Sequence, residues 1–176
     1  MEFVELVKER RSVRSYRETD NISADDLKQI IACALLAPSW KNSETGRYYA
    51  AISKEGIEAV RSCLPDFNQN STTNAAYLIA CFKKDISGFS NGVPVDENGN
   101  CWGAYDLGLQ NAYLLLKAKE LGYDTLVMGL RDEKGLKEIF NIPDDEIIMA
   151  VIAIGKRNGE IVLKPRKDVD EVLTIK

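Results

Sequence analysis

Apolar residues recur along the chain with two periods, and these predict a mixture of helices and strands. The longest helical pattern covers residues 102–121, where apolar side chains lie on nearly every face. Such a helix is buried on more than one side, either in the core or in a subunit interface. Shorter helical patterns cover residues 2–10 and 55–64. A further helix starts after the cap-like Ser23, with Asp26 in the acidic position of a capping box, and is stopped by Pro38.

Short apolar runs predict strands over residues 48–52, 75–82, 125–128 and 147–154, and the last is the most apolar and therefore central. A helix capped by Asp132 is expected to end near Phe140. Residues 65–73 predict a polar loop, and Asn158-Gly159 predicts a hairpin turn. Residues 87–100 predict a long loop that is either functional or a plain surface excursion.

Helices and strands do not alternate strictly in this order. The pattern therefore favours one α+β domain over residues 1–176, with a sheet flanked by helices, rather than a doubly wound fold. No Gly-x-Gly-x-x-Gly follows the first strand, and no phosphate-loop signature is present, so a Rossmann dinucleotide site is not expected.

The composition of the chain limits the kinds of partner that it can bind. The 176 residues are 45% apolar and 28% charged, with a formal net charge of −4, which disfavours a general nucleic-acid role. No apolar run approaches the roughly 20 residues that a membrane helix needs. The first residues are acidic where a signal peptide is basic, so we expect no membrane association and a cytoplasmic location.

Missing residue types narrow the chemistry. The chain has no histidine, which excludes Ser–His and Cys–His nucleophile pairs and histidine-ligated metal sites. Its four cysteines form no Cys-x-x-Cys pair, which argues against a zinc or thioredoxin-like site. Redox chemistry remains open to such a chain when a cofactor carries the reaction.

Residues 9–17 form an arginine-rich segment that contains Arg10, Arg11, Arg14 and Arg17. The segment is either a solvated basic turn or an anion pocket. Guanidinium groups bind phosphate in a bidentate manner, and the Ser12 hydroxyl adds a further donor. In an acidic protein, such a cluster favours a phosphorylated cofactor.

Three motifs carry a resemblance to a known family. The run Arg-Arg-Ser-Val-Arg-Ser-Tyr at 10–16, Ala-Pro-Ser-Trp-Lys-Asn at 37–42, and Asp-Leu-Gly at 106–108 with Glu-Leu-Gly-Tyr at 120–123 resemble signatures of the flavin-dependent nitroreductase family. They stand in the family's order with roughly its spacing, and the likeness runs from about residue 3 to residue 166. The resemblance implies a nitroreductase-like sheet flanked by helices and an intertwined homodimer with FMN at the subunit interface. The apolar helix at 102–121 fits such an interface, with a core helix in a monomer as the alternative.

By the family pattern, Arg10 and Ser12 hold the phosphate and ribityl side of FMN. Lys164 and Arg166 return from the tail to the same phosphate, unless that tail is simply solvated. Arg14 lies near the flavin N1 and C2 carbonyl, where a fixed cation favours the reduced state. The neighbouring Arg11 contributes through its backbone or is solvated.

The resemblance also assigns Pro38, Ser39, Trp40 and Asn42 to a loop that reaches the flavin from the other subunit. Trp40 departs from the small residue common at its position. Its ring packs against the flavin edge, narrows the substrate cleft, or is an ordinary core side chain.

Two further sites follow from the resemblance. Asn68 aligns with a position that hydrogen-bonds the pyrimidine edge of the flavin, where its amide offers a donor and an acceptor together. Val127, Met128 and Gly129 match the segment whose backbone passes the flavin N5, with the Met128 N–H as donor. The alternative for these three residues is the edge of an interior strand.

The activity implied by the resemblance is an FMN-dependent NAD(P)H oxidoreductase with a ping-pong hydride mechanism. NADH or NADPH is the reductant, and a nitroaromatic, a quinone or a similar small molecule is the acceptor. No side chain acts as acid or base in the hydride step, so no catalytic residue is assigned. Residues 43–46 depart from the family's Gln-Pro-Trp, and Ser71 replaces a common lysine. These departures leave open a specialised flavin reaction such as reductive dehalogenation, a non-catalytic flavin-binding or storage protein, and a structural dimer.

Overall fold

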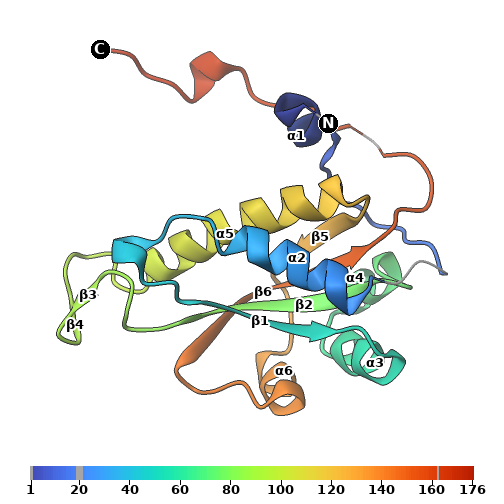
Figure 1. Cartoon of the computed structure of the whole chain (residues 1–176), viewed down its shortest axis with the longest axis horizontal. Coiled ribbons are helices and arrows are strands. Elements are labelled where there is room, and N and C mark those ends of the chain that lie inside the picture. The colour runs from blue at the N-terminus through green and yellow to red at the C-terminus, as the bar shows by residue number, and fades with distance from the viewer. Residues whose placement is uncertain (1, 19–21, 162) are drawn as a thin grey trace.

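An antiparallel sheet lies at the centre of the chain, and helices cover both of its faces (Figure 1). The computed structural model describes residues 2–18, 22–161 and 163–176. In these ranges the sheet has the order β1 (Gly46–Ala51), β2 (Ala76–Lys83), β6 (Glu146–Gly155) and β5 (Asp124–Met128), with antiparallel neighbours throughout. The helices are α1 (Phe3–Glu9), α2 (Ala24–Ala34), α3 (Lys54–Ser62), α4 (Asp66–Ser71), α5 (Cys101–Glu120) and α6 (Glu133–Phe140). This arrangement confirms the expected α+β fold.

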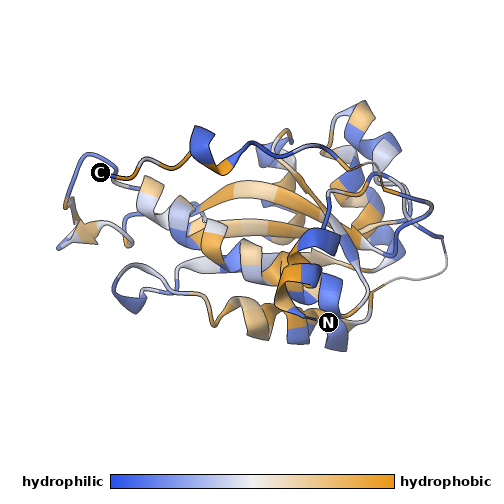
Figure 2. Ribbon diagram, turned by 90° about the horizontal axis from the view of Figure 1, so that it is seen from above, coloured by the Kyte–Doolittle hydropathy of each residue, from blue (hydrophilic) through white to orange (hydrophobic). Residues whose placement is uncertain are grey.

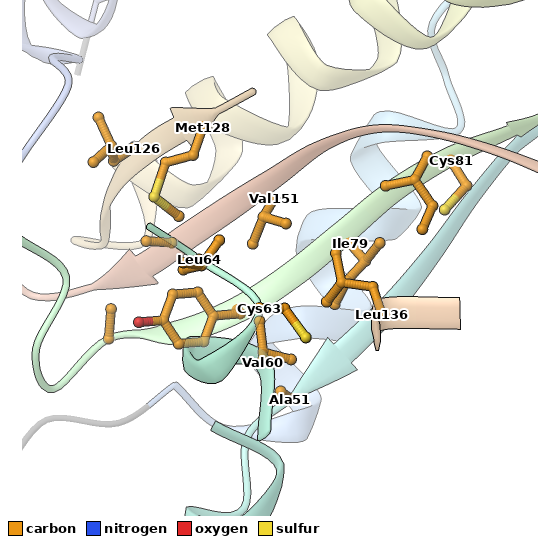
Figure 3. Close-up of a cluster of buried hydrophobic side chains, with 14 of the residues drawn as sticks. Ala51, Val60, Cys63, Leu64, Ile79, Cys81, Leu126, Met128, Leu136 and Val151 are labelled. Atoms are coloured by element: carbon orange, nitrogen blue, oxygen red, sulfur yellow. The ribbon is translucent and has the colours of Figure 1, made fainter. Parts of the chain in front are cut away.

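The sheet separates two apolar cores, because β2 and β6 alternate their side chains between its faces. On β2, Leu78 and Phe82 face the core beneath α2 and α5, whereas Ile79 and Cys81 face the core beneath α3 and α6. Figure 3 shows the second core, which contains Leu136 of α6. In Figure 2 the central strands are apolar along most of their length, as expected for strands covered on both faces.

Side-chain caps fix where the helices begin. The Ser23 hydroxyl accepts a hydrogen bond from the Asp26 N–H at 3.0 Å, and Asp132 accepts one from Gly135 at 3.2 Å, so both expected caps are confirmed. The Asp26 carboxylate accepts from the Tyr123 hydroxyl instead of completing the capping box. At the C-terminal end of α5, Gly122 adopts a φ of 84° and ends the helix as expected.

Three loop predictions need correction. Residues 65–73, predicted as loop, contain the short helix α4, because the Pro65 carbonyl accepts the N–H groups of both Asn68 and Gln69. The stretch 87–100 contains a small hairpin of β3 (Phe89–Ser90) and β4 (Val93–Pro94). Gly159 turns the chain with a φ of 85°, but no described strand after it pairs with β6, so the predicted hairpin is wrong. Tyr16 pairs with Arg157 at this end of β6 instead.

The long helix α5 buries one face within the chain and leaves another open. Leu107 and Leu114 are fully buried against the sheet, whereas Tyr105 and Tyr113 are 61% and 40% exposed. Among the described residues, no helix is long and apolar enough to cross a lipid bilayer.

Substituting Gly103 by alanine is expected to destabilise the fold by about 1–2 kcal/mol, because overpacking outweighs the gain in helix propensity. A Cβ at Gly103 would overlap the ring of Phe82 on β2, so α5 lies on the sheet only because this side chain is absent. Urea unfolding measures the change. The matched control is Gly56→Ala in α3, where an added Cβ comes no closer than 3.3 Å to Ser53 Oγ, so stability should stay equal or rise by up to about 1 kcal/mol from the gain in helix propensity. Equal stability of the two variants would contradict this prediction.

Candidate cofactor-binding site

The arginine-rich segment runs extended along the edge of the sheet. Val13 donates its N–H to the Thr125 carbonyl of β5 at 3.0 Å, and Arg17 donates its N–H to the Lys156 carbonyl at 2.9 Å. Val13 and Tyr16 point inward and are buried, and the intervening Arg14 points outward. The backbone of this segment is therefore paired and fixed, unlike that of a solvated turn.

A cavity of about 280 Å³ opens between this segment and the chain that follows β6. Ser12 and Arg14 form one wall, and Arg157 and Lys164 belong to the other. The structure thus brings together residues from both ends of the chain, as the sequence predicted for Ser12, Arg14 and Lys164. The rest of the lining comes from Val13, Ser15, Asn158, Gly159, Glu160 and Ile161.

Arg10 carries the clearest electrostatic signal. Burial lowers the pKa of Arg10 below its ordinary value, and the like charges of Arg11 and Arg166 lower it further. Among the described residues, neither Arg10 nor Arg166 forms an ion pair, whereas Arg11 donates to the Val7 and Arg10 carbonyls. A cluster of like charges without a counterion is the environment that binds an anion.

Arg157 also borders the site, although the sequence did not predict it as a cofactor-binding residue. It lines the cavity, and its Nε lies 4.0 Å from Oδ2 of Asp124, a buried carboxylate that also pairs with Lys119 Nζ at 2.9 Å. A basic residue next to Asn158-Gly159 reads as part of a surface turn, and only the pairing of Tyr16 with Arg157 shows that this turn faces the arginine-rich segment.

Asn68 lies on α4 and is only 7% exposed. Its side-chain amide forms no hydrogen bond with another described residue. Its backbone carbonyl accepts the Thr72 N–H at 3.0 Å. Asn74, three residues beyond α4, donates to the Tyr16 carbonyl at 3.5 Å and so ties this region to the arginine-rich segment. The amide atoms of Asn68 are not among the buried polar atoms that lack a partner, so they reach solvent, where a donor and an acceptor are open to a polar ligand.

At the end of β5, the groups available to a ligand are backbone groups, because Val127, Met128 and Gly129 carry no charged side chain. Val127 is 46% exposed, the Met128 side chain is buried in the core beneath α3 and α6, and Gly129 is exposed. Beside them, Thr125 already pairs with Ser12. The three residues predicted to pass the flavin are therefore the last two residues of β5, the strand that pairs with the arginine-rich segment, and the glycine that follows it.

Residues 38–42 lie elsewhere in the chain. Their η1 turn (Trp40–Asn42) packs on the first turns of α5, where Trp40 donates its N–H to Asp106 at 3.0 Å and its ring centroid lies 4.7 Å from that of Trp102. Ser12, in contrast, pairs with Thr125 of β5, the strand that follows the C-terminal end of α5 in the chain. Residues 106 and 120 are separated by about 21 Å along a helix. One chain thus does not bring Pro38, Ser39, Trp40 and Asn42 next to the arginine-rich segment.

The backbone of this turn is strained. Lys41, Asn42 and Glu44 have φ values of 47°, 56° and 48°, and non-glycine residues in that region cost on the order of 1–3 kcal/mol each, least for asparagine. Hydrogen bonds compensate for the strain, because Ser39 Oγ accepts the Glu44 N–H at 3.1 Å and Ser43 donates its N–H to the Trp40 carbonyl at 2.8 Å. Such strain persists where the surrounding structure requires one defined conformation.

Comparisons with known proteins give the family and the fold of the chain. A sequence profile of the nitroreductase family matches residues 7–156. The chain is 26% identical to YdgI of Bacillus subtilis, across 97% of this chain and 96% of that protein, whose name describes it provisionally as an NAD(P)H nitroreductase. It is 24% identical to protein DrgA of Synechocystis, across 96% of this chain and 90% of that protein. A structure from Exiguobacterium sibiricum, described provisionally as a nitroreductase in complex with FMN, has the same fold, with a TM-score of 0.86 and 22% identity across 100% of this chain and 98% of that one.

Proposed function

Because the chain belongs to the nitroreductase family, we propose that it binds FMN and acts as an NAD(P)H oxidoreductase that reduces an electron-poor acceptor such as a nitroaromatic compound or a quinone. The observation that carries this proposal is a set of cations that have no counterion among the described residues: Arg10 beside Arg166, and Arg14 with Lys164 in the lining of one cavity. A phosphate dianion needs two or three charge-assisted donors, and this group supplies them.

The residues present fit FMN in a defined order along the site. Arg10, Arg166 and Lys164 hold the phosphate, and Ser12 offers its hydroxyl on the same side. Arg14 stands as a fixed cation that stabilises negative charge on the flavin ring. The free amide of Asn68 offers a donor and an acceptor to the pyrimidine edge.

FMN supplies the redox chemistry when bound, because its ring accepts a hydride from a reduced nicotinamide and passes the electrons to the acceptor in a separate step. The chain needs no general acid or base for that exchange, which agrees with its lack of histidine. Its side chains bind and orient the ring, and Arg14 favours the reduced form through its charge.

We also propose that two chains share each site. The turn at Trp40–Asn42 is too far from Arg10 to contact the same ligand within one chain, so it serves the site of a second copy. The apolar surface agrees with this arrangement: α1 has no buried residue, and its Phe3 is 68% exposed. The tail from residue 163 onward is exposed throughout and runs away from the sheet past α1 (Figure 1). Exposed apolar side chains on a helix and an extended terminal segment are both typical of an interface between two copies of a chain.

The visible absorption spectrum of the purified protein tests the function. We expect a flavin spectrum, release of FMN on denaturation, and bleaching by NADH or NADPH without oxygen. Reoxidation by 1,4-benzoquinone then demonstrates the second half of the reaction. A protein that is colourless and fails to bind added FMN would overturn the proposal, and a flavin that no nicotinamide reduces would make this a flavin-binding protein without the enzyme activity.

A further inference from the structure

Asp106 is a buried carboxylate that joins two distant segments. It lies on α5 and is only 3% exposed. Its Oδ2 accepts the Trp40 N–H at 3.0 Å and the Ser87 hydroxyl at 2.6 Å. Among the described residues no cation pairs with it. A buried carboxylate is retained only where hydrogen bonds replace its hydration, and here both donors come from outside its own helix.

The first segment is the strained turn that starts at Trp40. Its left-handed residues Lys41 and Asn42 directly follow the N–H that Asp106 binds. Downstream of them, the Ser43 hydroxyl lies 2.7 Å from the Ser87 hydroxyl, which itself donates to Asp106. The turn is therefore held on both sides of its strained residues by one connected set of hydrogen bonds.

The second segment is the loop 87–100, and α5 holds it at two points one helical turn apart. Ser87 binds Asp106, and Asp96 accepts the Trp102 indole N–H at 2.9 Å. Gly88 has a φ of 82°, and a Cβ there would lie 2.5 Å from Trp102 Cδ1, so the loop backbone lies directly against this ring. The ring of Trp102 also contacts Trp40. A cavity of about 390 Å³, lined by Asn98, Cys101, Trp102 and Tyr105, opens beside this cluster.

We propose that Asp106 is a positioning residue that holds the Trp40–Asn42 turn and the loop 87–100 as one unit, so that the turn presented to the cofactor and the loop bordering the aromatic cavity keep a fixed relation. Its effect on the cofactor rests on the proposed function, because the turn is assigned there to the FMN site of the second copy. Its effect on the turn and the loop does not depend on a cofactor.

We call Asp106 together with the turn and the loop that it joins the clamp. The two tryptophans of the chain allow the state of this clamp to be measured. Trp40 and Trp102 are the chain's only two tryptophans, and their rings are 4.7 Å apart and tilted by 53°. Two indoles at this distance couple strongly, so the near-ultraviolet circular dichroism of the cofactor-free protein reports on the clamp directly. The variant Asp106→Asn keeps the shape of the side chain but removes its negative charge, so the oxygen that accepts from both Trp40 and Ser87 becomes a weaker acceptor.

For Asp106→Asn we expect the near-ultraviolet tryptophan signal to fall by about half or more with an unchanged far-ultraviolet spectrum. The FMN dissociation constant should rise about tenfold, because a neutral hydrogen bond contributes about 1–1.5 kcal/mol less than one to a charged group. The variant Ser87→Ala keeps the Trp40 bond and removes one of the two bonds by which α5 holds the loop. It should therefore raise KM for 1,4-benzoquinone by about threefold while kcat stays within about twofold. The control is Asp145→Asn, the same chemical change at an exposed carboxylate paired with Lys83, which should behave as the parent protein.

An Asp106→Asn protein with the parent's tryptophan signal would overturn the proposal. If that variant does not fold, Ser87→Ala decides, and parental KM together with a parental tryptophan signal would count against the clamp. If the parent protein binds no FMN and the Asp106→Asn variant still loses the tryptophan signal, the proposed function is wrong but the role of Asp106 in holding the turn and the loop is supported.

Discussion

Replacing Arg10 by alanine is expected to weaken FMN binding by about 10–100-fold, because a hydrogen bond between charged groups contributes about 1.5–3 kcal/mol. The same change should leave the cofactor-free protein at least as stable as the parent. Arg10 is partly buried beside Arg11 and Arg166, and both burial and these like charges lower its pKa. Removing it relieves a repulsion that only a bound anion offsets. Cofactor affinity and cofactor-free stability are thus expected to change in opposite directions.

Fluorescence titration of FMN into cofactor-free protein measures the affinity, and thermal unfolding with and without FMN measures the stability. Lys28→Ala is the matched control, since it removes one positive charge from an 80% exposed side chain on α2 and should change neither quantity. Arg10→Lys should retain part of the affinity, because the charge remains while the bidentate fork is lost. A parental dissociation constant for Arg10→Ala would remove Arg10 from the phosphate site, and a loss of cofactor-free stability would indicate a structural role instead.

Periodicity is sufficient to predict the elements that bury a continuous apolar face. The helix at 102–121 and the strands at 75–82 and 147–154 fall close to their observed bounds, because α5, β2 and β6 form the interior of both cores. The short helix α4 carries no such signal. Its only buried residue is the polar Asn68, and it is held by backbone bonds to Pro65, which hydropathy does not report.

The site shows the same division. The arginine-rich segment stands out because four like charges in an acidic chain need an explanation. Arg157 carries no such signal in the sequence, and Asp106 stands out only within the Asp-Leu-Gly motif, which does not indicate its partners. Their partners lie 33 and 66 positions away, at Asp124 and Trp40, so only the folded backbone brings them together. The left-handed backbone of Lys41 could not be predicted from the sequence either, because the intrinsic propensity of lysine does not favour that conformation.

Two variants that damage different halves of the site are expected to restore FMN binding when their chains are combined. Arg10→Ala disables the phosphate half and leaves the turn at Trp40–Asn42 intact. The double variant Ser39→Ala with Asn42→Ala disables the turn and leaves the arginines intact. If each site takes its phosphate half from one chain and its turn from the other, a mixed dimer contains one undamaged site and one doubly damaged site. Random pairing then makes roughly one quarter of all sites undamaged.

Co-expression with two affinity tags isolates the mixed dimer, and FMN bound per chain after gel filtration reports the recovery. The sharp control combines Arg10→Ala with Arg166→Ala, because the structure places both arginines in one half of the site of the same chain, and no mixed dimer of these two contains an intact site. Recovery in the first combination and none in the second is the pattern that a shared site requires. A stable monomer that binds FMN, or equal occupancy in both combinations, would mean that each chain completes its own site and that the turn at Trp40–Asn42 serves another purpose.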